Sequence, residues 1–209
     1  MEITYIGLGC LRLRGRDADV LIDPLEDTPR GLRLPKLDPD IVVCTSGRTD
    51  PARLRGEDGQ PQTVSGAGEF EVAGVRITGH ALGDGMAAMC VIVDDVRVVA
   101  LGSLSRQLSE EVVDALGHVD VLAVPVGGGG ALAATEAVSL VNTIEPFIVI
   151  PIRYGTGGMW TELEGVDRFA KEMGLSDGFE AQPKLVLTGS SGSVEQTRVI
   201  VLEPRAQLQ

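Results

Sequence analysis

The sequence is poor in aromatic residues and lacks a long apolar run. Phe, Trp and Tyr make up 3% of the 209 residues, so any core is built mainly from aliphatic side chains. No stretch approaches the roughly 20 apolar residues that a membrane-spanning helix needs. Residues 1–6 read as a strand, and no basic segment followed by an apolar one indicates a signal peptide. These absences predict a cytoplasmic protein that does not insert into membranes.

Basic residues are also scarce relative to acidic ones. The chain has 18 Lys and Arg against 30 Asp and Glu, which gives a formal net charge of −12. Such a surface repels nucleic acid phosphates and anionic membranes, so both are excluded as expected partners.

Residues that commonly bind metals are few. Cys10, Cys44 and Cys90 are odd in number, widely spaced and set in strand-like segments, which predicts buried free thiols rather than disulfides. There are only two histidines. His118 precedes an apolar run and reads as a surface turn residue, and His80 with Asp84 would supply only two donors.

Hydrophobic residues (44%) and 27 glycines indicate a sizeable core with many tight turns, and the length suits a single domain over residues 1–209. The first half is rich in hairpins, two of them with turns at Ala73-Gly74 and Asp94-Asp95. In the second half buried strands alternate with helices. The expected strands are 3–6, 10–13, 18–24, 41–45, 69–72, 75–78, 88–93, 96–101, 119–126, 147–152, 185–188 and 197–202, and the expected helices are 50–54, 109–116, 133–144 and 161–173. Two packed sheets with helices outside would bury this set, so the fold class is α/β.

The most informative stretch for function is Ile41-Val42-Val43-Cys44-Thr45-Ser46-Gly47-Arg48-Thr49-Asp50. An apolar run there ends in a polar loop with one acid, one Arg and several hydroxyls. A buried strand delivers side chains to the rim of a sheet in this way.

This stretch and several segments elsewhere resemble the metallo-β-lactamase fold superfamily. The segments on which the resemblance rests are Ile22-Asp23-Pro24, Gly66-Ala67-Gly68-Glu69-Phe70-Glu71-Val72-Ala73-Gly74-Val75, Val119-Asp120-Val121-Leu122 before Pro125-Val126-Gly127-Gly128-Gly129, and Glu145-Pro146 before Ile148-Val149-Ile150-Pro151. They are similar to the small bacterial branch of Zn-dependent hydrolases that is related to ascorbate-phosphate lactonases. The resemblance implies a four-layer αββα sandwich over the whole chain.

At the positions where that family holds metal ligands, this chain carries other residues. The family's Thr-His-x-His-x-Asp-His loop keeps Thr45 and Asp50 but has Ser46, Arg48 and Pro51 in place of histidine. Elsewhere Leu8, Ser103 and Arg153 replace a His, a bridging Asp and a His, and one further ligand position falls near Asp84. Only Asp50 of the usual ligands is clearly present.

This pattern leads to the expectation that the metal site has been lost. A catalytic Zn²⁺ site needs about three protein donors, and guanidinium has no lone pair to offer. At an effective dielectric constant of ~20, a positive charge about 4 Å from a divalent ion costs on the order of 8 kcal/mol. We therefore expect no Zn or Mn cofactor and a non-catalytic homologue (a pseudoenzyme) with a binding, regulatory or assembly role. The alternative is a metal-dependent hydrolase of the superfamily with a rebuilt site.

If the fold holds, a former metal pocket is ringed by Ser46, Arg48, Asp50, Asp84, Ser103, Arg106, Arg153 and Tyr154. One hypothesis is structural: Asp50 pairs with Arg48 or Arg153, so that an Arg charge replaces the metal charge. Another is that Arg48 and Arg153 bind an anionic small molecule. Metal-free catalysis by Ser46 or Ser103 is a third, although no nearby base is evident. A homo-oligomer is compatible with the family resemblance, and nothing local in the sequence tests it.

Overall fold

A computed structural model describes residues 1–24, 32–33, 35–47, 60–156, 158–175, 178–189 and 196–208. Two mixed β-sheets form the framework of this part of the chain. The expected strand at 41–45 is confirmed as the fully buried β5, and the expected short helix at 50–54 lies outside the described residues.

The first sheet has six strands in the order β13-β1-β2-β3-β5-β6. The neighbours β13, β1, β2 and β3 pair in antiparallel fashion, whereas β3, β5 and β6 run parallel to one another. The strands are β1 (Glu2–Gly7), β2 (Cys10–Arg14), β3 (Asp19–Ile22), β5 (Ile41–Cys44), β6 (Gln62–Ser65) and β13 (Leu185–Val186).

The second sheet has seven strands in the order β14-β12-β11-β10-β9-β8-β7. Here β7 to β10 form an antiparallel meander, and β10, β11, β12 and β14 are parallel. The strands are β7 (Gly68–Val72), β8 (Val75–Gly83), β9 (Met86–Val93), β10 (Val96–Ala100), β11 (Val121–Pro125), β12 (Ile148–Ile152) and β14 (Arg198–Val199). A separate short pair joins β4 (Leu32–Arg33) to β15 (Gln207–Leu208).

Three helices are described: α1 (Glu110–Leu116), α2 (Ala134–Ile144) and α3 (Val166–Glu172). The hydroxyl of Ser109 caps α1 by accepting from the N–H of Val112, and the carboxylate of Glu136 accepts from the N–H of Ala133 at the start of α2. Among the described residues no helix has the length and apolar content to cross a bilayer.

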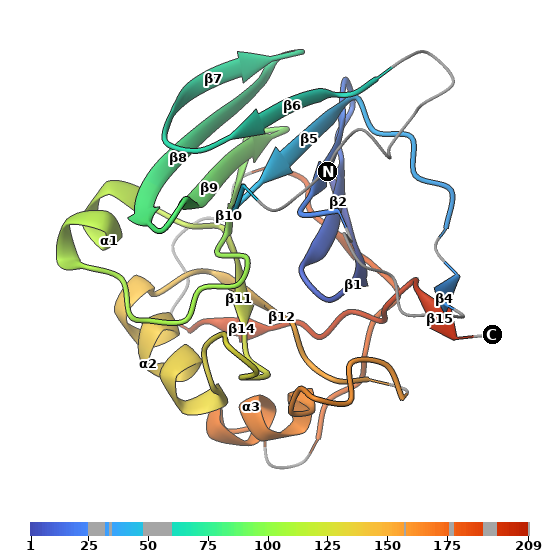
Figure 1. Ribbon diagram of the computed structural model, residues 1–209, viewed down its shortest axis with the longest axis vertical. Coiled ribbons are helices and arrows are strands. Elements are labelled where there is room, and N and C mark those ends of the chain that lie inside the picture. The colour runs from blue at the N-terminus through green and yellow to red at the C-terminus, as the bar shows by residue number, and fades with distance from the viewer. Residues whose placement is uncertain are drawn as a thin grey trace.

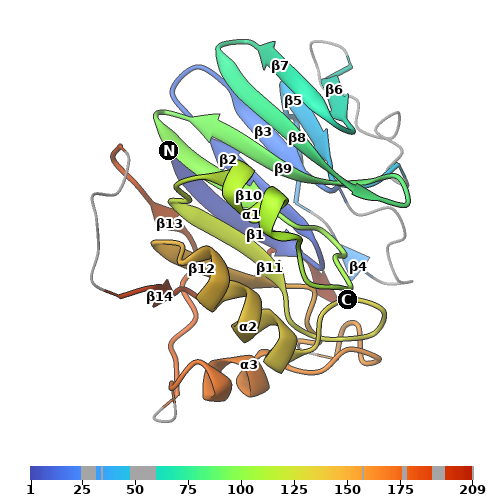
Figure 2. The same ribbon diagram turned by 90° about the vertical axis from the view of Figure 1, so that its left-hand side faces the viewer.

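The two sheets lie face to face over one aliphatic core, as predicted from the sequence. Side chains from both sheets fill it, such as Leu11 and Val43 from the first and Met89 and Val98 from the second. In both views the described helices lie along the seven-stranded sheet, with β1 and β2 on the other side (Figures 1 and 2). The two-sheet α/β sandwich is therefore confirmed.

The two short hairpin turns predicted from the sequence are confirmed. Ala73 and Gly74 have φ angles of 48° and 75°, and Asp94 and Asp95 have 50° and 64°. Positive φ at both central residues is the turn geometry that matches the right-handed twist of paired strands.

Other element boundaries differ from the sequence expectation. The β8–β9 hairpin runs on to a turn at Asp84-Gly85, beyond the expected strand ends. The helix expected over 161–173 begins only at Val166, because Glu164 donates its N–H to the carbonyl of Gly127 and so leaves the helical path. Strand β6 was missed because its sequence, Gln62-Thr63-Val64-Ser65, is mostly polar.

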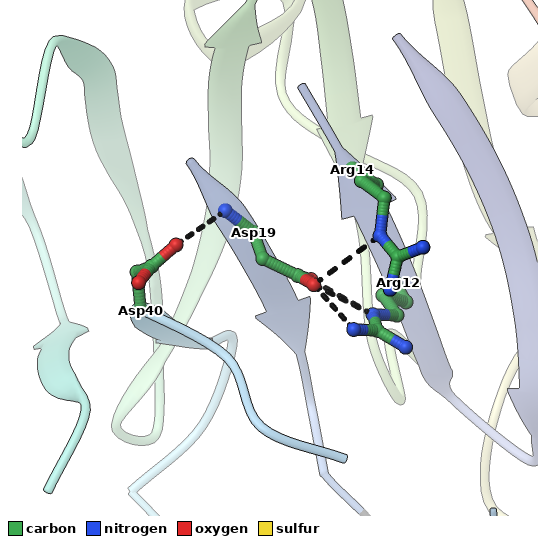
Figure 3. Close-up of polar contacts among 4 residues, drawn as sticks. All are labelled: Arg12, Arg14, Asp19 and Asp40. Atoms are coloured by element: carbon green, nitrogen blue, oxygen red, sulfur yellow. Dashed lines mark hydrogen bonds and ion pairs between the residues drawn. The ribbon is translucent and has the colours of Figure 1, made fainter. Parts of the chain in front are cut away.

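Charged side chains lie on the outward face of the six-stranded sheet. Arg12 and Arg14 on β2 both point to the carboxylate of Asp19 on β3, and Asp40 accepts the backbone N–H of Asp19 at 2.8 Å (Figure 3). Arg12 Nε lies 2.8 Å from Asp19 Oδ1. The cluster fixes the β2–β3 register at the end of these strands remote from Asp23.

The corner where β6 passes into β7 leaves no room for a side chain on β8. A Cβ added at Gly79 would lie 1.9 Å from the carbonyl oxygen of Gly66. The nearest atoms belong to the backbone of Gly66 and Ala67, so a side chain at position 79 would force the backbone to move.

We expect Gly79→Ala to lower the free energy of unfolding by at least about 2 kcal/mol, because it forces the two backbones apart. Urea denaturation measures this. Gly47→Ala is the control: a Cβ there meets nothing within 4 Å, so its change should stay within about 0.5 kcal/mol. Equal stability of the two variants would show that the corner is loosely packed.

Candidate functional site

The carboxyl ends of strands from both sheets meet at one edge of the sandwich. Asp23 follows β3, Thr45 follows β5, Gly102 lies just beyond β10 and Arg153 follows β12. Parallel strands of an open sheet place ligand sites at this edge. We call these four residues, with Gly9 from the β1–β2 turn, the rim.

Asp23 and Thr45 form the centre of the rim. The N–H of Thr45 donates to Asp23 Oδ1 at 2.7 Å, and the Thr45 hydroxyl donates to Asp23 Oδ2 at 2.6 Å. A Cβ on Gly102 would lie 1.9 Å from Thr45 Oγ1 and 3.0 Å from Asp23 Oδ2. The ends of β3, β5 and β10 are therefore locked together by one carboxylate, and only glycine fits at position 102.

Arg153 is held at the rim through its backbone. Its N–H donates to the carbonyl of Leu8 at 2.6 Å, and its own carbonyl accepts from the N–H of Gly127 at 3.1 Å. Its φ angle is 54°, a left-handed conformation that is uncommon for a residue with a side chain. The side chain remains partly exposed, and its Cγ lies 3.9 Å from the position of a Cβ on Gly9, with Asp23 Cβ 3.8 Å from the same point.

Two buried tyrosines support this arrangement from below. The Tyr5 hydroxyl donates to the carbonyl of Leu8 at 2.9 Å, and the Tyr154 hydroxyl donates to the carbonyl of Leu202 at 3.2 Å. Their ring centroids are 5.6 Å apart. Burial raises the pKa of Tyr5 well above its usual value and also raises the pKa of Tyr154, so both stay neutral donors at physiological pH.

The end of the β8–β9 hairpin completes the surroundings of the rim. Ser46 forms a β-bridge with Met86, and Ala87 donates its N–H to the carbonyl of Thr45 at 2.8 Å. In the hairpin turn, Asp84 lies 3.2 Å from Arg106. The exposed fractions of the side chains are 85% for Asp84 and 56% for Arg106, so solvent screens this ion pair strongly.

Most site residues predicted from the sequence come together here, but not all. Ser46, Asp84, Ser103, Arg106 and Arg153 lie at or beside the rim. Tyr154 is buried beneath it at 2% exposure and serves as support, not as lining. Arg48 and Asp50 lie outside the described residues, so the predicted pairing of Asp50 with Arg48 or Arg153 stays a prediction.

Sequence reasoning did not assign a role to Asp23, Leu8 or Gly102. The Ile22-Asp23-Pro24 phrase marked Asp23 as part of the family resemblance, and the strand that ends at Pro24 indicated a position at a sheet edge. Its bond to Thr45 joins residues 22 positions apart, which no local pattern reveals.

The described residues do not by themselves provide a metal centre. In the part of the chain that the structure describes, no group of three or more His, Cys, Asp or Glu side chains lies together. Asp23 already accepts two hydrogen bonds, and Asp84 is paired with Arg106. His118 contacts Asp120 at 3.2 Å, remote in the chain from the rim residues. A site with about three protein donors therefore needs donors beyond the described residues.

Cys10, Cys44 and Cys90 are buried, and none of them is in a disulfide among the described residues, as predicted. Burial raises the pKa of Cys90, which disfavours its reactive thiolate.

Comparison with known proteins identifies the family. Residues 2–153 match the model of the Beta-lactamase superfamily domain, and the chain belongs to this family. The resemblance inferred from the sequence motifs is thus confirmed.

Relatives and solved structures agree with this assignment. The chain is 25% identical to a UPF0173 metal-dependent hydrolase of Natranaerobius thermophilus, over 75% of this chain and 84% of the relative. It is 26% identical to the UPF0173 metal-dependent hydrolase MK1542 of Methanopyrus kandleri, over 84% and 94%. A Thermotoga maritima protein (tm0207), provisionally described as a Zn-dependent hydrolase of the metallo-β-lactamase superfamily, superposes with a TM-score of 0.79 at 26% identity, covering 97% of this chain and 98% of that one. Igni18, a metallo hydrolase of Ignicoccus hospitalis, shares the fold with a TM-score of 0.62 at 18% identity.

These comparisons correct the functional expectation drawn from the sequence. The expectation of a pseudoenzyme with a lost metal site and no Zn or Mn cofactor is wrong, because the relatives are named metal-dependent hydrolases. The alternative stated with that expectation, a metal-dependent hydrolase with a rebuilt site, agrees better with the relatives. Replacement of ligands at the family's usual positions does not exclude donors from elsewhere in the chain.

We expect Thr45→Val to lower the free energy of unfolding by about 1.5–3 kcal/mol, since it removes a hydrogen bond to a carboxylate without changing side-chain volume much. Thermal or urea unfolding measures the loss. Thr143→Val is the matched control, because that hydroxyl bonds to the Ser139 carbonyl on an exposed helix face. A Thr45→Val variant as stable as this control would show that the bond to Asp23 contributes little.

Proposed function

We propose that this protein is a metal-dependent hydrolase of the metallo-β-lactamase superfamily with a metal site rebuilt from a donor set other than the family's histidines. Family membership and the names of its relatives support the reaction class. The observation that carries the proposal is the rim, where strand ends of both sheets converge on a carboxylate held by two short hydrogen bonds.

The rim has the rigidity that a catalytic site requires. Asp23, Thr45 and Gly102 leave almost no freedom at the ends of three strands, and Arg153 is fixed on both sides of its backbone. Side chains that must meet a reacting group within a fraction of an ångström need support of this kind.

Oxygen donors are the available chemistry for a rebuilt site. Asp84 is an exposed carboxylate beside the rim that would exchange its solvent-screened contact with Arg106 for a metal, and the sequence places Asp50, Glu57 and Asp58 in the stretch 48–59, outside the described residues. Carboxylate oxygens bind Zn²⁺ and suit Mn²⁺.

Metal analysis by inductively coupled plasma mass spectrometry, on protein loaded with Zn²⁺ or Mn²⁺ and then dialysed, tests the proposal. We expect near-stoichiometric metal, and hydrolysis of p-nitrophenyl ester or phosphodiester probes that a chelator removes and metal restores. Asp50→Asn and Asp84→Asn should each lower metal content at least tenfold.

Asp95→Asn is the matched control, because Asp95 is exposed in the β9–β10 turn at the far end of the sandwich and Asn tolerates its φ of 64°. It should leave both readouts unchanged. Less than a tenth of an equivalent of metal together with no metal-dependent hydrolysis would refute the proposal.

A further inference from the structure

We propose that Arg153 anchors an oxyanion group of the substrate, so that the hydrolase acts on anionic substrates; this assignment of substrate class rests on the proposed function. The proposal stands on the position of Arg153, on how its backbone is held and on the charge that it places at the rim.

Arg153 lies beside the central carboxylate of the rim. Its Cγ and the Cβ of Asp23 lie 3.9 Å and 3.8 Å from a Cβ position on Gly9. The absence of a side chain at Gly9 leaves both residues next to each other at the partly exposed edge. Arg153 and Asp23 are therefore neighbours at this edge, so a group bound by Arg153 lies close to Asp23.

The backbone of Arg153 is fixed at an energetic cost. A left-handed conformation is unfavourable for a non-glycine residue, and glycine would avoid it. Hydrogen bonds to Leu8 and from Gly127 hold Arg153 there nonetheless. Strain of this kind persists where the position of a side chain matters for function.

Arg153 is one of three left-handed non-glycine residues at this edge. Among the described residues there, Leu8 and Asp23 also have positive φ, and Leu8 lies in the β1–β2 turn. Trp160 packs on the same turn, since a Cβ on Gly7 would lie 2.5 Å from its ring. Arg153 follows the end of β12, so a hairpin turn does not account for its left-handed backbone.

Arg153 is the basic residue of the rim of an acidic protein. The chain carries 30 acidic against 18 basic residues, and Arg106 beside the rim is paired with Asp84. The guanidinium of Arg153 therefore supplies the positive charge that a bound anion would meet.

Guanidinium chemistry suits this role. A guanidinium has five N–H donors in a planar fork, so a carboxylate or phosphate adds to the contacts that Arg153 makes within the protein. Two parallel hydrogen bonds orient such a group, which an ammonium does not achieve.

The test uses Trp160, the single Trp of the sequence, as an internal reporter. Trp160 packs on Gly7 in the turn whose Leu8 carbonyl accepts the Arg153 N–H, so an anion at Arg153 should change its fluorescence. Inorganic phosphate and acetate are titrated separately, with and without added metal, and calorimetry checks each affinity.

We expect Arg153→Gln to weaken binding of the preferred anion at least tenfold and Arg153→Lys to weaken it about threefold to tenfold, as lost bidentate contacts predict. Arg76→Met is the control. Arg76 lies near the other end of β8, seven residues from Gly83 and roughly 23 Å away at strand rise, so its loss should leave affinity unchanged. Tighter binding of phosphate than of acetate would indicate that the substrate carries a phosphate group. Tighter binding of acetate would indicate that it carries a carboxylate group.

Kinetics separate this proposal from the proposed function. For anionic and neutral ester probes of matched leaving group, Arg153→Gln should raise KM for the anionic probe at least tenfold and leave the neutral probe unchanged. Unchanged anion affinity and unchanged KM in folded Arg153→Gln and Arg153→Lys variants would overturn the anchoring role while metal-dependent hydrolysis stands. If the unmodified protein binds the anion but hydrolyses no probe, and Arg153→Gln loses that binding, the anion site is supported and the hydrolase assignment is overturned.

Discussion

The rim depends on a single carboxylate. Asp23 accepts both the backbone N–H and the hydroxyl of Thr45, and Gly102 packs against the pair closely enough to exclude any side chain. These contacts join the ends of strands from both sheets. Removing a carboxylate from water is costly unless hydrogen bonds replace the lost water, and the two bonds from Thr45 do so for Asp23.

Around this junction the family's frame is retained while its side-chain chemistry differs. The two-sheet sandwich and its edge match the relatives, whereas Leu8, Ser46 and Arg153 stand where the family resemblance implies histidines. A fold does not dictate which residues carry the chemistry. The relatives are named metal-dependent hydrolases, and the rim is the rigid edge at which Asp23 and Arg153 stand in this chain.

Elements that depend mainly on short-range interactions were predicted correctly from the sequence. Ala73-Gly74 and Asp94-Asp95 predicted hairpins because two-residue turns depend on their own backbone angles. The buried run at β5 predicted a strand covered on both faces. Strands β4, β6 and β15 escaped notice because pairing with distant segments stabilises them more than their own residues do.

The sequence by itself determined the core, the hairpins, the family and the replacement of histidines, since each depends on residue type and short spacing. Only the tertiary structure decided that Asp23 binds Thr45, that Tyr154 lies beneath the rim and that Arg153 adopts a left-handed backbone held by Leu8. Those contacts join residues far apart in the chain. Their geometry follows from how the two sheets pack, which no local pattern encodes.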